Sequence, residues 1–196
     1  MKFLTIVIPC FNESDSLPSL INYLSSLNKE INFLIVENGS TDQSSFYLKE
    51  NENRLNSNIE ILYLNENKGY GHGVLTGLKS IEESKFIGWM HGDLQFEFAK
   101  LDNVYSELLV ASNENNYIFY KGKRVGRNFV EKFFSFFMGI LATIILRVKL
   151  SEINAQPTIF SQELLDNFSN PPEDFSFDTY VYWLAIKNNY KVIRKE

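Results

Sequence analysis

Short apolar segments rich in β-branched and aromatic residues alternate with stretches long enough for a helix, and this alternation constrains the fold most strongly. It is typical of βαβ units and predicts a mostly parallel sheet covered by helices, a Rossmann-like three-layer α/β sandwich. We expect a single domain over residues 1–196, because the chain has no repeat, linker or low-complexity segment. The predicted strands are Phe3–Pro9, Phe33–Val36, Ile59–Leu64, Phe86–Met90 and Tyr117–Tyr120.

Composition excludes several classes of protein. A hydrophobic content of 44% over 196 residues supports a substantial core, and the net charge of −5 argues against a general nucleic-acid binder. The lone cysteine, Cys10, cannot form an intramolecular disulfide, and we expect it to be buried. The first apolar segment is too short for a signal peptide, so we expect a cytoplasmic protein.

Polar residues follow four of the predicted strands at the point where each strand ends. In a parallel sheet, ligands bind outside the carboxyl ends of the strands, so a binding site is expected there. The residues concerned are Asn12–Glu13, Glu37–Asp42, Asn65–Gly73 and His91–Gln95.

The motifs at these strand ends resemble those of family 2 glycosyltransferases. Pro9 to Glu13 fits the family pattern P-x-x-N-E, and Val36 to Asp42 fits V-D-D-G-S-x-D with Glu37 and Asn38 in place of the two aspartates. The resemblance spans essentially the whole chain and looks closest to the dolichyl-phosphate mannosyltransferase-like branch, whose acceptors are polyprenyl phosphates. Further matches are Asn67–Gly71, Asp93–Gln95, Lys121–Arg124 and Phe175–Asp178.

The resemblance implies a glycosyltransferase type A fold that binds a nucleotide-diphosphate sugar, linked to UDP or GDP. Residues 1–95 would bind this donor, and residues 96–196 would form the acceptor side. The physical chemistry agrees, because the oxygens of Glu37 and Asn38 suit a base or ribose and Glu13 can reach the ribose or sugar phosphate. Asn38 with Gly39 is also a common tight-turn pair, and both interpretations can hold together. The predicted donor-binding residues are Pro9, Phe11, Glu13, Glu37, Asn38, Ser40, Asp42, Gly69 and Gly71.

A diphosphate leaving group calls for charge neutralisation, usually by a divalent cation such as Mn²⁺ or Mg²⁺. The family has a D-x-D pattern where this chain has His91-Gly92-Asp93, and by resemblance Asp93 is the main metal ligand. Gln95 offers a further oxygen ligand. His91 could be a third metal ligand, in which case the site would suit Mn²⁺ better than Mg²⁺. Alternatively, His91 donates a hydrogen bond to one of the ligands, or it only ends a strand.

Two further residues are candidates for catalysis beside Asp93. Arg124 occupies the arginine position of the family's G-S-R motif and would bind acceptor or donor phosphate. It belongs to a basic cluster with Lys121, Lys123 and Arg127, for which phosphate binding is the favoured interpretation and a run of solvated surface charges the alternative. Asp178 would orient sugar hydroxyls or the acceptor, since a phosphate acceptor is already an anion and needs no strong base.

The segment from about residue 128 to residue 147 is apolar on nearly every helical face. The uncharged part, Phe133–Leu146, is shorter than a membrane span and is flanked by cations. We therefore expect a helix that lies on the membrane surface, with a core or dimer helix as the alternative. The oligomeric state stays open.

These features predict an inverting glycosyltransferase, peripheral at the inner face of the membrane, that transfers a hexose to a polyprenyl phosphate. One rival hypothesis is the same fold acting on a soluble saccharide acceptor. The other is a nucleotide-sugar-binding protein without catalysis, suggested by His91 in place of an aspartate.

Overall fold

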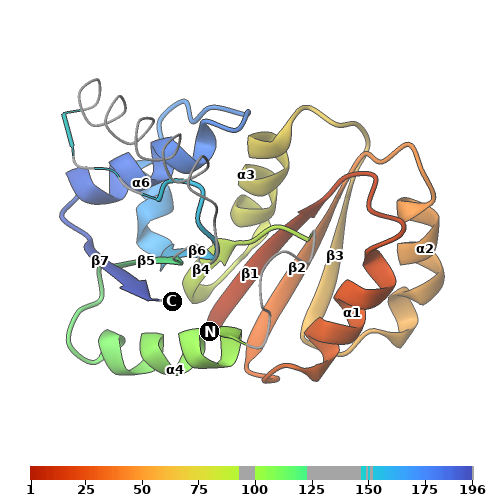
Figure 1. Ribbon diagram of the computed structural model, residues 1–196, viewed down its shortest axis with the longest axis horizontal. Coiled ribbons are helices and arrows are strands. Elements are labelled where there is room, and N and C mark those ends of the chain that lie inside the picture. Colours follow the sequence, from red (N-terminus) through yellow and green to blue (C-terminus); the bar gives the residue numbers. More distant parts are fainter. Residues whose placement is uncertain (93–99, 123–146, 149, 151, 196) are drawn as a thin grey trace, which may run out of the picture.

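The computed structural model of the protein describes residues 1–92, 100–122, 147–148, 150 and 152–195. The described residues form one seven-stranded sheet in the order β3-β2-β1-β4-β6-β5-β7, and Figure 1 shows the strands in this order from right to left. The strands are β1 (Lys2–Cys10), β2 (Ile31–Asn38), β3 (Ile59–Leu64), β4 (Ser84–Trp89), β5 (Ile118–Gly122), β6 (Thr158–Ser161) and β7 (Lys191–Lys195).

The sheet is mostly parallel, as predicted. β1 pairs in parallel with β2 and β4, β2 with β3, and β5 with β7, whereas β6 runs antiparallel to both β4 and β5. All five strands predicted from the sequence are present, with ends shifted by a few residues. β6 and β7 were not predicted from the sequence. The α-helices are α1 (Leu17–Ser26), α2 (Ser44–Asn51), α3 (Tyr70–Ser80), α4 (Leu101–Ser112) and α6 (Phe177–Lys187), and the 3₁₀ helices are η1 (Glu52–Arg54) and η3 (Gln162–Asn167).

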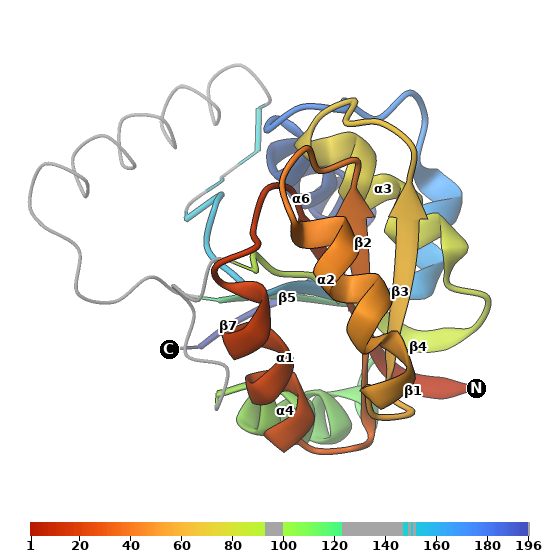
Figure 2. The same cartoon turned by 90° about the vertical axis from the view of Figure 1, so that its right-hand side faces the viewer.

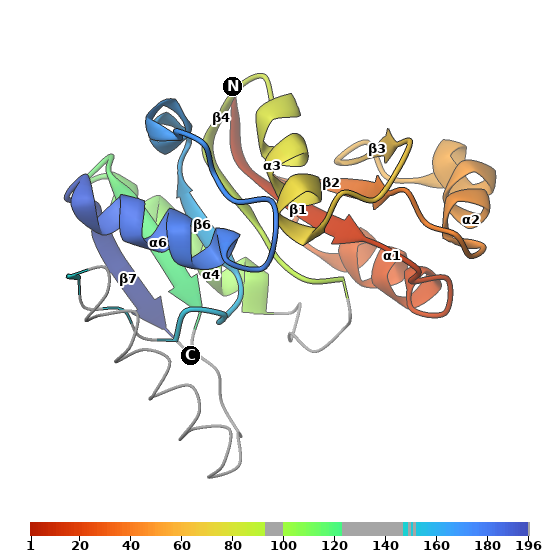
Figure 3. The same ribbon diagram turned by 90° about the horizontal axis from the view of Figure 1, so that it is seen from above.

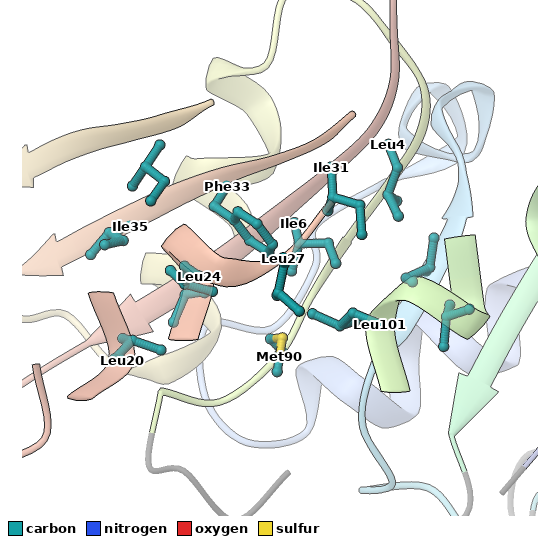
Figure 4. Packing of buried hydrophobic residues seen from close by; sticks show 14 of the residues in the cluster. Leu4, Ile6, Leu20, Leu24, Leu27, Ile31, Phe33, Ile35, Met90 and Leu101 are labelled. Carbon is teal, nitrogen blue, oxygen red and sulfur yellow. The ribbon is translucent and has the colours of Figure 1, made fainter. Parts of the chain in front are cut away.

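Helices cover both faces of the sheet and divide the core into two clusters. On one face, α1, α2 and α4 contribute the leucines Leu20, Leu48 and Leu101. Figure 4 shows Leu20 and Leu24 of α1 packing toward Ile6 and Phe33 of the sheet, and Figure 2 shows α1 and α2 running along the sheet. On the other face, α3 and α6 bury Val74, Leu78 and Val181. The three-layer α/β sandwich expected from the sequence is therefore confirmed.

The loops after β1, β2 and β3 and the first turns of α3 and α6 come to the carboxyl edge of the sheet. Seen from above in Figure 3, the segment before α6 runs beside the start of α3, although about a hundred residues separate the two in the sequence. Among the described residues, none of the helices is both long and apolar enough to cross a bilayer.

Candidate donor site at the carboxyl edge of the sheet

Asn12 joins the loop after β1 to the loop after β2. Its Oδ1 accepts hydrogen bonds from the backbone N–H of Thr41 at 2.8 Å and of Asp42 at 3.3 Å, and from the Thr41 hydroxyl at 3.3 Å. In return, the Asn12 N–H donates to Ser40 Oγ at 3.1 Å. Asn12 has a φ of +57°, a left-handed conformation that asparagine tolerates better than most residues. One side chain therefore fixes the position of two loops.

Asp42 and Ser44 extend this connection into the start of α2. Asp42 accepts the N–H of Ser44, the first residue of α2, at 2.8 Å, and the N–H of Ser14 at 3.1 Å. The hydroxyl of Ser44 accepts the N–H of Glu13 at 2.9 Å. Burial acts to raise the pKa of Asp42, but the hydrogen bonds from Ser44 and Ser14 outweigh it and lower the pKa to about 2. Ser40 and Asp42, both predicted to bind the donor, therefore hold the loops by their side chains.

Glu37 and Asn38 end β2 as buried polar residues, each about 3% exposed. Glu37 Oε1 accepts the N–H of Ser40 at 2.7 Å, and Asn38 Nδ2 donates to the Gly69 carbonyl at 3.2 Å. Asn38 Oδ1 is buried and has no hydrogen-bond partner within the described part of the protein. Gly39 follows with a φ of +69°, the left-handed backbone that the tight-turn interpretation of Asn38-Gly39 required.

The other predicted donor-binding residues of the first loop are Pro9, Phe11 and Glu13. Pro9 lies in β1 in register with Val36, and Phe11 is 42% exposed. Glu13 Oε2 accepts a hydrogen bond from the Ser16 hydroxyl, so its carboxylate is held at the start of α1. Cys10 between them is buried, and burial together with the charges of Glu13 and Glu37 raises the pKa of its thiol.

Gly69 and Gly71 flank Tyr70 at the start of α3 and lie against the segment before α6. A Cβ on Gly69 would lie 2.7 Å from the Glu173 carbonyl oxygen, and one on Gly71 would lie 2.7 Å from that of Asp174. The backbone N–H of His72 donates to the Glu173 carbonyl at 3.0 Å, and His72 Nδ1 lies 3.4 Å from the Glu173 carboxylate. In this structure the two glycines allow close packing of protein backbone. An approach of a diphosphate to them stays a prediction.

Asp178 is the second residue of α6 and is almost completely buried, with a side chain 5% exposed. Its Oδ1 lies 3.5 Å from Lys121 Nζ and 3.5 Å from Gln156 Nε2. Lys121 is fully buried and also donates to Thr158 Oγ1 at 2.7 Å. The expectation that Lys121 belongs to a surface basic cluster is therefore wrong, because its ammonium pairs with a buried carboxylate inside the fold.

An aromatic stack borders Asp178 on the side of α3. The ring of Tyr70 lies between His91, at 5.2 Å, and Phe175, at 5.0 Å, and is inclined by 13° to each. Phe175 is 76% exposed, so it is the solvent-facing ring of the stack. This stack was not predicted from the sequence, and neither was the contact of Gln156 with Asp178.

Asp93, Gln95 and Arg124 lie outside the described residues, as does most of the apolar segment 128–147. Within the described ranges, no three His, Cys, Asp or Glu side chains are grouped so that they could hold a metal ion. The imidazole of His91 is stacked against the ring of Tyr70, with the ring centroids 5.2 Å apart. The carboxylate of Asp93, the amide of Gln95 and the imidazole of His91 are all groups that bind divalent cations, so these residues fit the predicted metal site.

The fold and the loops at its carboxyl edge define an α/β domain of the glycosyltransferase type A class. The sequence model of Glycosyl transferase family 2 matches residues 5–151, and the chain belongs to this family.

Solved structures of similar fold support the same class. The S. aureus TarS 1–349 structure has a TM-score of 0.69 and 20% identity, covering 98% of this chain and 58% of that one. Mannosyltransferase PcManGT from Pyrobaculum calidifontis, in complex with GDP-Man and Mn²⁺, has a TM-score of 0.70 and 16% identity, covering 98% and 54%. Glucosyl-3-phosphoglycerate synthase from Mycobacterium tuberculosis, solved with Mn²⁺, UDP and glucosyl-3-phosphoglycerate, has a TM-score of 0.70 and 13% identity, covering 98% and 69%. The chain thus spans little more than half the length of the first two.

Proposed function

We propose that this chain transfers a hexose, with inversion, from a UDP- or GDP-sugar to a polyprenyl phosphate at a membrane surface. The observation that carries the proposal is the pair of interlocked loops after β1 and β2, which present Glu37 and Asn38 at the carboxyl edge of a family 2 fold. Related folds supply precedent for the donor, because TarS has been solved with UDP-GlcNAc and PcManGT with GDP-Man and Mn²⁺.

Donor binding in this proposal uses atoms that the fold leaves without a partner. Asn38 Nδ2 is bonded to Gly69, which fixes the amide so that the unpaired Oδ1 can accept a hydrogen bond from the base or ribose. Glu37 has one oxygen bonded to Ser40, and its carboxylate can accept a second hydrogen bond. Asp93, Gln95 and, in the fullest ligand set, His91 would hold a divalent cation, whose charge would neutralise the diphosphate.

The acceptor side relies on charge and orientation. The acceptor phosphate is already an anion, so it attacks the anomeric carbon in line while the diphosphate leaves, without a strong general base. Asp178 orients a sugar hydroxyl or the acceptor, and Arg124 binds a phosphate group. The apolar segment 128–147 places the protein at the inner face of the membrane, where a polyprenyl phosphate resides.

A donor and acceptor panel tests the reaction. The chain is incubated with UDP- and GDP-sugars and Mn²⁺ or Mg²⁺, with either a short-chain polyprenyl phosphate or a soluble saccharide, and the anomer of the product is determined by NMR. Transfer to the polyprenyl phosphate with inversion is the expected result. Transfer to the soluble acceptor alone would replace the lipid acceptor, and donor binding without any transfer would favour a binding protein.

The metal and membrane parts have separate tests. Asp93→Ala should weaken divalent-dependent binding of the nucleoside diphosphate, whereas His91→Asp, which restores the family pattern, should keep or raise activity with Mg²⁺. Replacing Phe133, Phe137 and Ile144 together by serine should abolish sedimentation with anionic vesicles and preserve nucleotide binding. Unfolding of that triple variant would assign these side chains to the core instead.

A further inference from the structure

Tyr70 occupies an unusual position, because it contacts two elements that belong to different parts of the site. It is the first residue of α3, and its ring lies between His91 after β4 and Phe175 before α6. The glycines on both sides of it make this possible, since Cβ atoms there would collide with the backbone that carries Phe175 into place. The two glycines therefore allow the ring of Tyr70 to lie between His91 and Phe175.

The environment of the Tyr70 hydroxyl indicates that this residue does more than pack its ring. It is buried and, within the described residues, has no hydrogen bond of normal geometry, but it lies close enough to the Asp178 carboxylate to interact with it. Burial, followed by the charge of Asp178, raises the pKa of Tyr70 well above its usual range. Trp89 Nε1 and Gln156 Oε1 are also buried without a partner, and both residues lie near enough to influence the same hydroxyl.

A buried hydroxyl without a hydrogen bond is costly, and phenylalanine would fill the same space without that cost. If this position served packing alone, the oxygen would only lower stability. Its location beside a buried carboxylate, which the Lys121 ammonium and Gln156 already approach, indicates that it acts on Asp178.

We propose that Tyr70 is a positioning residue of the transfer reaction, whose ring braces His91 and whose hydroxyl orients the Asp178 carboxylate. The ring holds His91, which lies two residues after the end of β4 and two residues before Asp93, and the hydroxyl acts on Asp178, so one side chain links the metal side and the acceptor side of the proposed site. This inference rests on the proposed glycosyltransferase function.

Two substitutions separate the roles of the ring and the hydroxyl. Tyr70→Phe keeps the stack and removes the oxygen, and Tyr70→Leu removes both. For Tyr70→Phe we expect a melting temperature equal to or above that of the wild type, donor KM within about twofold, and kcat lowered roughly 10- to 100-fold because Asp178 is misplaced. A residue that only packs would give no such split between stability and turnover.

A spectroscopic measurement tests the brace without reference to activity. The chain has only two histidines, His72 and His91, so the imidazole C–H signals are assigned in one step with a His91→Asn variant. Loss of the stacked ring in Tyr70→Leu should shift the His91 signals at fixed pH, whereas Tyr70→Phe should leave them in place. The matched control is Tyr190→Phe, which removes an oxygen from a buried tyrosine beyond the far end of α6 and should turn over like the wild type.

The outcomes distinguish this inference from the function on which it rests. A wild type that transfers no sugar to any acceptor overturns the proposed function. An active wild type with an equally active Tyr70→Phe overturns the positioning role of the hydroxyl, and unchanged His91 signals in Tyr70→Leu overturn the brace.

Discussion

Substitution of Asn12 should destabilise the protein through two separable effects, the loss of hydrogen bonds and the strain of a left-handed backbone. Its Oδ1 accepts one short hydrogen bond, from the Thr41 N–H at 2.8 Å, and two longer ones at 3.3 Å. In an exposed loop the short bond contributes about 1 kcal/mol and the longer ones together about 0.5–1 kcal/mol. Alanine at a φ of +57° adds roughly 1 kcal/mol of backbone strain.

A series of three variants resolves these contributions. Asn12→Ala should lower the free energy of unfolding by about 2.5–3 kcal/mol, which in a chain of this length lowers the melting temperature by roughly 5–12 °C. Asn12→Gly should lose the hydrogen bonds and avoid the strain, although the unfolded chain then gains flexibility that costs about 0.5–1 kcal/mol. Asn12→Asp keeps an acceptor and tolerates the left-handed region, so it should lie within about 0.5 kcal/mol of the wild type.

Urea denaturation followed by circular dichroism measures all three, and thermal shift with a nucleoside diphosphate reports the donor site. Donor affinity should fall in Asn12→Ala, because the loop that follows Glu37 and Asn38 is released. An Asn12→Ala variant as stable as the wild type would refute the interlocking of the two loops. A loss of the same size in Asn12→Asp as in Asn12→Ala would show that neither the acceptor oxygen nor the left-handed backbone is responsible.

Three further predictions follow from single contacts. Asp42→Asn should lower stability most at neutral pH. Because the pKa of Asp42 in the folded protein is lowered to about 2, the stability difference from the wild type should shrink as the pH falls from about 5 to 2. Denaturation at each pH measures this difference. Lys121→Met should cost about 3–5 kcal/mol because it leaves the Asp178 carboxylate buried without its cation, and adding Asp178→Asn should recover part of the loss in a double-mutant cycle. Gly71→Ala should cost about 1–3 kcal/mol and speed proteolysis of segment 172–175, since the new Cβ meets backbone at 2.7 Å; wild-type stability would contradict that packing.

The architecture was predictable because the strands of a parallel sheet are apolar on both faces and therefore stand out in the sequence. β1 and β3 were located almost to the residue. β6 was missed because its four residues, Thr158–Ser161, are too few to show a period, and β7 because Lys191–Lys195 mixes charges with apolar residues at the sheet edge.

The candidate site was predictable in its residues more than in their roles. The motifs drew attention to Ser40 and Asp42, but their partners in the loop after β1 lie 28 residues away, and no local pattern reveals a hydrogen bond to a distant backbone N–H. Lys121 was read as a surface charge because lysines are rarely buried. Only the packing of β5 against α6 shows that Asp178 accompanies it inside the fold.

The polar residues at the carboxyl edge form two groups, those whose side-chain oxygens are all hydrogen-bonded within the protein and those with one polar atom left over. Asn12 and Asp42 have their side-chain oxygens bonded to the backbone of the two loops, so their substitution should change stability and donor affinity together. Within the described residues, the nitrogen of Asn38 is bonded and its oxygen is unpaired, whereas the ring of Tyr70 is packed and its hydroxyl has no hydrogen bond of normal geometry. A buried polar atom without a partner is tolerated in a native protein when something outside the polypeptide completes it or when it acts on a neighbour. The unpaired oxygens of Asn38 and Tyr70 are therefore the atoms through which this scaffold can be expected to act, the first on the donor and the second on Asp178.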